Sequence, residues 1–163
     1  MQMIRMWAAG AFAFTALGGC SGEKPVQPAD VKAAMNQHVQ PEAEIYWQAV
    51  QYISDEKGAR EIVPHSDVEW NRTAEAARKL KTFGESLKQP AYAQGKGTDW
   101  QDYAQGLVDA AGRAETAALA RKPEQVLEAG GTLYNVCSAC HEVYMPVPGG
   151  LAPTDQTSTK PAG

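Results

Sequence analysis

Apolar residues recur at a spacing of three or four positions along four stretches of the chain. This spacing places them on one face of a helix and therefore predicts amphipathic α-helices. The stretches cover about residues 30–53, 66–88, 98–118 and 123–145. No long run alternates apolar and polar residues, and β-branched residues are sparse. The pattern predicts an all-α fold, an antiparallel four-helix bundle.

Residues at the starts of two of these stretches resemble helix caps. Ser66 is followed three positions later by Glu69, and Thr98 is followed three positions later by Gln101. In such a capping box, the two side chains satisfy backbone N–H groups that the first helical turn leaves without partners. The second and third helices are therefore expected to begin at these residues.

Three features interrupt the predicted helices. Pro41 lies inside the first helix and has no backbone N–H, so it should kink the helix or break its hydrogen-bond ladder. Residues 54–65 contain a glycine and a proline and predict a loop. Gly130 and Gly131 fall inside the fourth helix, where the missing side chains could admit a neighbouring helix or a flat ligand.

The N-terminal segment has the composition of an export signal. Arg5 is followed by an apolar stretch over residues 6–18, and small residues then precede Cys20. This stretch is shorter than the roughly 20 residues that a membrane-spanning helix needs. We therefore expect residues 1–19 to be a signal peptide, with a buried N-terminal helix as the alternative.

The segment Leu17-Gly18-Gly19-Cys20 also resembles the bacterial lipobox. In lipoproteins of this type the cysteine is lipidated and the chain is cleaved just before it, so the resemblance implies a lipid anchor at Cys20. Several acyl chains on one residue hold a domain firmly to a membrane surface. We expect a periplasmic protein anchored to a membrane, with the outer membrane favoured because Ser21 is not acidic. Ordinary signal cleavage and secretion is the alternative.

Composition divides the rest of the chain into three parts. Residues 20–29 carry the anchor cysteine and a short polar tether that contains proline. Residues 30–145 form the predicted helical domain, which is long enough for one compact core. Residues 146–163 contain four prolines, three glycines and few apolar residues, so this tail is predicted to be disordered.

The candidate chemistry is concentrated at residues 137–141, where Cys-Ser-Ala-Cys-His forms the C-x-x-C-H pattern of covalent haem attachment. Cysteines at positions i and i+3 share one face of a helix, so Cys137 and Cys140 can both add to the vinyl groups of one porphyrin edge. His141 follows directly, and a neutral imidazole is a good iron ligand. The pattern predicts haem c, bound covalently by Cys137 and Cys140, with His141 as an axial ligand of its iron.

Three other uses of these cysteines stay open at this point. A C-x-x-C pair can be a redox dithiol, although that motif normally accompanies strands, which the pattern does not predict. A zinc site needs four ligands, and two cysteines with one histidine fall short of that number. In an exported protein the pair could also form a structural disulfide. Haem attachment would use two of the three cysteines of the chain, and lipidation would use the third, Cys20.

A helical chain with C-x-x-C-H near its C-terminal end resembles the class II c-type cytochromes, the cytochrome c prime group. The resemblance covers roughly residues 30–145, and its specific part is the motif at residues 137–141. It implies a four-helix bundle whose last helix carries the haem, residence in the periplasm, and a role in electron transfer or small-gas binding. Tyr144 matches an aromatic position after the motif, whereas Met145 and Pro146 stand where many relatives have a basic residue near the haem.

The second axial ligand of the iron decides between those two roles. After removal of residues 1–19, Met35 and Met145 are the remaining methionines. Met145 follows His141 too closely to reach the opposite side of the haem. Met35 lies in the first predicted helix, where methionine-ligated members of this family place their distal ligand, and we expect it to bind the iron. His38 follows Met35 by one helical turn and is the rival ligand.

Charge narrows the range of partners. The formal net charge of −4 disfavours a nucleic-acid partner. Removal of residues 1–19 takes away one charge, that of Arg5, and changes −4 to −5, which favours a redox partner with a basic docking patch. The sequence shows no catalytic set of side chains, so an enzyme is not expected.

Together these observations predict a lipid-anchored cytochrome that carries one electron at a time between periplasmic or membrane partners. The alternative is a five-coordinate haem protein that binds nitric oxide or carbon monoxide. Homodimers are common in the family that the chain resembles, so a homodimer stays open.

Overall fold

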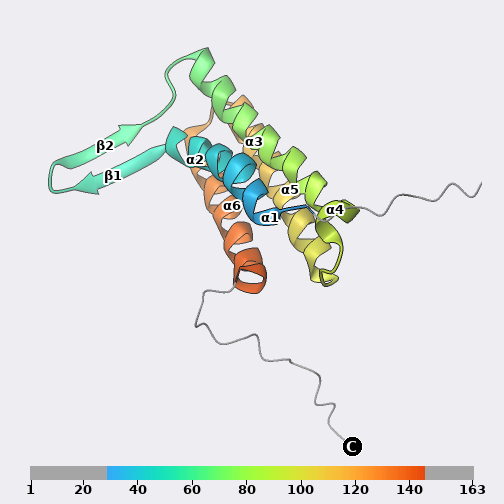
Figure 1. Ribbon diagram of the computed structural model, residues 1–163. Coiled ribbons are helices and arrows are strands. Elements are labelled where there is room, and N and C mark those ends of the chain that lie inside the picture. Colours follow the sequence, from blue (N-terminus) through green and yellow to red (C-terminus); the bar gives the residue numbers. More distant parts are fainter. Residues whose placement is uncertain (1–28, 146–163) are drawn as a thin grey trace, which may run out of the picture.

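The computed structural model describes residues 29–145, and this part of the chain is mostly helical (Figure 1). The expected signal peptide, the anchor residue Cys20 and the expected tail lie outside the described residues. No helix within the described range is both long and apolar enough to cross a membrane. The elements in chain order are α1 (Val31–Ala34), the π-helix η1 (Met35–Val39), α2 (Gln40–Ala49), β1 (Gln51–Asp55), β2 (Gly58–Ile62), α3 (Asp67–Leu87), α4 (Pro90–Ala93), α5 (Asp99–Leu119) and α6 (Pro123–Tyr144).

One of the two predicted capping boxes is confirmed. The Ser66 hydroxyl accepts a hydrogen bond from the Glu69 backbone N–H, and the Glu69 carboxylate accepts one from the Ser66 backbone N–H. The box predicted at Thr98 and Gln101 is wrong, since Thr98 has helical backbone angles and its side chain caps nothing. Backbone turns already begin at Gly97, whereas a capping side chain needs an extended backbone at its own residue.

The disturbance expected at Pro41 takes the form of a π-helical turn. Pro41 offers no N–H to the carbonyl four residues earlier. Just before it the ladder widens, and the Gln40 N–H donates to the carbonyl of Met35, five residues back. Residues 31–49 therefore stay in one continuous helical segment, but the wider turn changes which side chains share a face.

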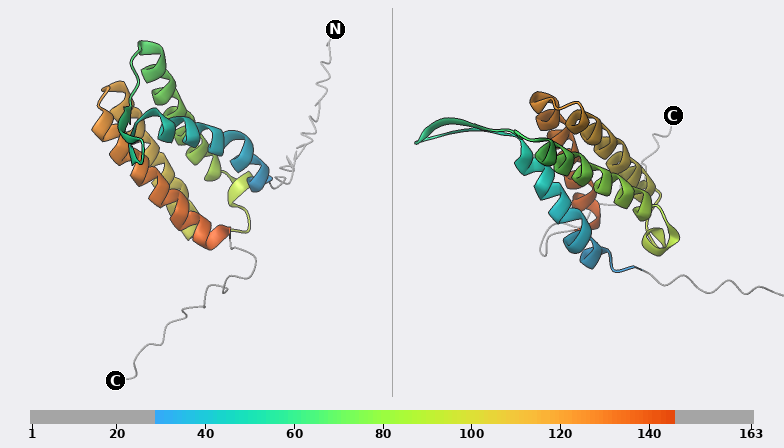
Figure 2. Two further views of the ribbon diagram at one scale, coloured as in Figure 1. Left: turned by 90° about the vertical axis from the view of Figure 1, so that its left-hand side faces the viewer. Right: turned by 90° about the horizontal axis from the view of Figure 1, so that it is seen from above.

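The all-α prediction fails at a small two-stranded sheet. The first helical segment ends at Ala49 rather than near residue 53, and much of the expected loop at residues 54–65 is a β-hairpin that projects from the helices (Figures 1 and 2). β1 pairs antiparallel with β2, and Gly58 adopts a φ of +106° at the turn, which favours glycine. Strands of five residues give too short an alternation to be separated from a helical pattern.

The long helices pack side by side. α3 lies along α5, α5 lies along α6, and α2 packs on α3 (Figure 1). Fully buried alanines let α5 approach its neighbours closely, namely Ala110, Ala111, Ala114 and Ala118. Tyr46, the largest of the side chains that are less than 2% exposed, donates a hydrogen bond from its hydroxyl to the Ala114 carbonyl at 3.1 Å, so this buried phenol is satisfied.

The two adjacent glycines of α6 have different surroundings. A Cβ atom at Gly130 would lie 3.3 Å from Cδ1 of Trp47, and the Trp47 indole N–H donates to the Gly130 carbonyl at 2.9 Å. Gly130 therefore admits α2 at close range, which is one of the two expected uses. A Cβ at Gly131 would meet nothing within 4 Å.

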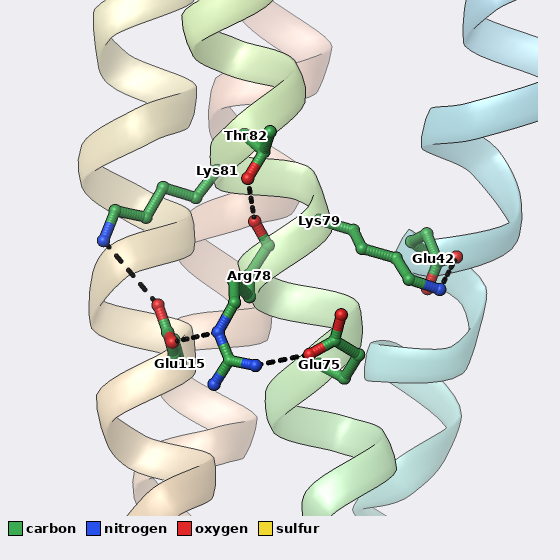
Figure 3. A network of polar contacts seen from close by, with 7 residues as sticks. All are labelled: Glu42, Glu75, Arg78, Lys79, Lys81, Thr82 and Glu115. Carbon is green, nitrogen blue, oxygen red and sulfur yellow. Dashed lines mark hydrogen bonds and ion pairs between the residues drawn. The ribbon is translucent and has the colours of Figure 1, made fainter.

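A group of surface ion pairs joins three of the helices (Figure 3). Lys79 on α3 binds Glu42 on α2 at 2.8 Å. Arg78 and Lys81, also on α3, reach Glu115 on α5 at 2.8 and 3.7 Å. Water screens exposed pairs of this kind and they contribute little, so the buried contacts dominate the stability of the helix packing.

The contact between α3 and α5 gives a direct test of this packing. A Cβ at Gly84 would lie 2.8 Å from Cγ2 of Val108, so Gly84→Ala should lower the free energy of unfolding by about 1–3 kcal/mol. The matched control is Gly112→Ala on α5, where a Cβ meets nothing within 4 Å and the better helix propensity should stabilise by about 0.5–1 kcal/mol. Urea unfolding followed by circular dichroism measures both values, and equal effects at the two sites would contradict this account of the packing.

Candidate functional site

Residues from four elements line one narrow cleft, with a cavity volume of about 40 Å³, at the end of the molecule where α6 finishes and α5 begins. Met35 and His141 lie near opposite ends of the described chain, yet both line this cleft. The full lining consists of Met35 and Val39 from η1, Leu87 from α3, Trp100, Tyr103, Ala104 and Leu107 from α5, and Val136, Cys137, Cys140 and His141 from α6. The structure thus brings together the four residues that the sequence proposed for haem binding.

Cys137 and Cys140 present their thiols to the cleft from successive turns of α6. Both side chains are partly buried, and neither forms a disulfide. Burial raises the pKa of the Cys137 thiol. Burial raises the pKa of the Cys140 thiol to about 11, with smaller contributions from electrostatic repulsion by Cys137 and Asp99. Both groups are therefore protonated thiols at neutral pH, unlike the low-pKa thiolates of reactive dithiol sites.

The raised pKa predicts how Cys140 reacts in the haem-free chain. Since the thiolate is the nucleophile, alkylation of Cys140 by iodoacetamide should be slow near pH 8 and should accelerate as the pH approaches 11. In urea the thiol regains an ordinary pKa near 9, so the same reaction should be fast near pH 9. Because the folded state binds the Cys140 proton more tightly than the unfolded state does, the thiol contributes its full stabilisation below about pH 9. This contribution is lost as the pH rises through about 11. A folded-state alkylation profile centred near pH 9 would contradict the burial of Cys140.

His141 and Met35 face the cleft from different helical segments. His141 is partly buried in the last turn of α6, directly after Cys140. Met35, partly buried, opens the π-helical turn of η1 and shares the cleft lining with Val39, four residues later. A histidine and a methionine on two separate segments can bind an iron from opposite sides, whereas two residues of one turn cannot.

The rival ligand His38 does not line the cleft. Its side chain is exposed and lies 6.4 Å from the ring of Phe83, in a separate groove that includes Glu42. In an α-helix, residues i+3 and i+4 both lie near the face of residue i, but the wider turn of η1 rotates His38 further from Met35 while Val39 stays beside it. The π-helical turn therefore separates the two candidate ligands, and Met35 is the one brought to Cys137 and His141.

The walls of the cleft are apolar and aromatic. Trp100 is 2% exposed, and its indole N–H donates to the Leu87 carbonyl at 2.7 Å, which fixes the ring as one wall. Leu107 and Val136 add aliphatic surface. Such a lining favours a mostly apolar ligand. Trp100 and Leu107 lie on the apolar face of α5, and periodicity alone does not separate a residue of the core from one that lines a cleft.

One residue that the sequence did not indicate supplies a positive charge close to the cleft. Lys96, between α4 and α5, places its Nζ atom 5.2 Å from the ring of Trp100 and 5.6 Å from the ring of Tyr144. Its charge acts on Cys140 by lowering the pKa that burial raises.

These residues fit a covalently attached haem. Two unpaired thiols share one face of α6, an imidazole follows them, a thioether lies on another segment, and the walls between them are apolar. Within residues 29–145, no three or more His, Cys, Asp or Glu side chains are grouped to hold a metal ion by themselves. In a haem, the porphyrin itself provides the four equatorial nitrogen ligands, so the chain has only the axial positions to fill.

Comparison with known proteins adds no assignment: no family model, no curated protein and no solved structure matches this chain.

Proposed function

We propose that this protein is a c-type cytochrome that carries one electron at a time through haem c attached to α6. The cleft carries the proposal, because it brings Cys137, Cys140 and His141 of α6 to Met35 of η1. Bound haem supplies an iron that alternates between its ferric and ferrous states. Within the proposal, the helices form an antiparallel four-helix bundle, with α3, α5 and α6 joined by short connections and α2 packed on α3.

Each side chain of the cleft has a definite task in this proposal. Cys137 and Cys140 hold the cofactor permanently through two thioether bonds. His141 and Met35 would hold the iron through a nitrogen and a sulfur, a pair that would raise the reduction potential relative to two histidines. The apolar walls keep water away from the iron. No side chain of the cleft is required to make or break a substrate bond, so electron exchange needs no catalytic group.

The proposal also covers location and partners. An export signal at residues 1–19 and lipid on Cys20 would hold the domain at the periplasmic side of a membrane, with the outer membrane favoured. Its partners would be periplasmic or membrane redox proteins. An acidic net charge of −5 after cleavage supports docking to a basic patch on such a partner.

The proposal is tested by expressing the full chain in bacteria that mature c-type cytochromes. A denaturing gel stained for haem peroxidase activity should show a coloured band at the size of the chain, because thioether bonds survive denaturation. The absorption spectrum of the purified protein should show low-spin haem, and the oxidised form should show the near-infrared band of methionine–iron ligation. A correctly exported, colourless chain would contradict the proposal, and a high-spin spectrum with free uptake of carbon monoxide would support gas binding instead.

A further inference from the structure

A short hydrogen bond fastens the last turn of α6 to the first turn of α5. The Tyr144 hydroxyl donates to Oδ1 of Asp99 at 2.6 Å, a length typical of a bond from a hydroxyl to a charged carboxylate. Partial burial, followed by the Asp99 interaction, raises the pKa of Tyr144 to about 12, so its hydroxyl keeps its proton. Asp99 stands at the first position of α5, where the helix dipole favours a negative charge.

The rings around this bond belong to the cleft. The Tyr144 ring meets Trp100 edge to face at 4.9 Å and 88°, and it meets Tyr103 at 6.2 Å and 85°. Trp100 and Tyr103 both line the cleft. Gly97 leaves room for the bond, since a Cβ there would clash with Oδ1 of Asp99 and lie 3.2 Å from the Tyr144 hydroxyl.

His141 lies in the turn that this bond holds. Tyr144 follows His141 by three residues, and the Met145 N–H donates to the His141 carbonyl at 2.9 Å, which closes the last turn of the helix. Helix ends fray unless something outside the helix holds them.

We infer that Tyr144 is a positioning residue for His141, and that its hydrogen bond to Asp99 fixes the direction from which the imidazole enters the cleft. The inference rests on the proposed function, because that direction matters only if His141 binds an iron. In this inference, two residues outside the attachment motif, Tyr144 and Asp99, determine the orientation of the ligand His141.

The test compares variants of the full, haem-loaded protein. Tyr144→Phe keeps the ring contacts and removes only the hydroxyl. Hydrogen exchange at the Met145 amide should become about tenfold faster, as expected for loss of one bond to a charged group. Electron paramagnetic resonance of the oxidised iron should show shifted or broadened g values, because these follow the orientation of the axial imidazole.

Three further variants separate positioning from general destabilisation. Gly97→Ala should reproduce both changes while Tyr144 and Asp99 stay in place in the sequence, because its Cβ would displace the Asp99 carboxylate; this variant keeps the test valid if Tyr144→Phe folds poorly. Asp99→Asn keeps an acceptor oxygen and should retain g values close to those of the parent. Tyr134→Phe removes a hydroxyl from an exposed tyrosine of α6 outside the cleft, and neither signal should change.

The outcomes distinguish this inference from the proposed function. Parental g values and exchange rates in haem-loaded Tyr144→Phe and Gly97→Ala would overturn the role of Tyr144 and leave the cytochrome proposal intact. Equal changes in Tyr134→Phe would also overturn it. A parent chain that carries no haem would refute the proposed function, and the positioning role would fall with it.

Discussion

Replacing Cys137 and Cys140 together by alanine should abolish covalent haem binding, so that the stained band on a denaturing gel disappears. Both thiols line the cleft and neither is used in a disulfide, so the substitution removes the two attachment atoms without breaking another covalent link. Any haem that still enters the apolar cleft would be held only by its iron ligands and by packing, and denaturation would release it. The ratio of haem to protein after acid–acetone extraction measures the loss, which should be complete.

A matched variant shows that the effect belongs to the thiols. Ser138 lies between the two cysteines and does not line the cleft, so Ser138→Ala should keep a full complement of haem. Each single cysteine variant keeps one attachment atom and should retain a weaker stained band. Persistence of full staining in the double variant would contradict the assignment of both thioether bonds.

Met35→Ala should convert the haem from low spin to high spin and lower its reduction potential by an amount on the order of 0.1 V, since axial ligands set the potential over a wide range. Met35 is the methionine that lines the cleft together with His141. The near-infrared methionine–iron band should vanish, and the reduced protein should bind carbon monoxide at the position that the sulfur had occupied. Absorption spectra in both redox states and a potentiometric titration measure these changes.

His38→Ala is the matched control for Met35→Ala. His38 belongs to the same π-helical turn but is exposed in another groove, so its removal should leave the spectrum and the potential unchanged. If His38→Ala rather than Met35→Ala abolished the low-spin spectrum, the chain would use two histidines. If the parent were already high spin, the gas-binding alternative would gain support and Met35 would be a packing residue.

Much of the helical framework was predictable because it depends on local chemistry. The Ser66–Glu69 box acts within one turn, and the spacing of Trp70, Leu80 and Leu133 places each of them in the core. The hairpin was not predictable in the same way. Five-residue strands have too few positions for a clear alternation, and the turn depends on Gly58 at a positive φ.

The residues of the candidate site were likewise predictable only in part. The spacing within Cys137–His141 indicated the attachment residues without any knowledge of the fold. The choice between Met35 and His38 could not be made from sequence, because α-helical geometry gives them the same face and only the π-helical turn separates them. Lys96 also escaped notice, since nothing near it in sequence indicates that it lies beside Trp100 and Tyr144.

By itself, the sequence determined the helical nature of the domain and the chemistry offered by one helix, because helical periodicity and the C-x-x-C-H spacing act over a few residues. The tertiary structure alone decided which distant side chains meet that chemistry: a methionine from the first helical segment, aromatic walls from α5, and a tyrosine–aspartate bond at the end of α6. The physical reason is that such contacts depend on the register and rotation of packed helices, and a single π-helical turn is enough to change them.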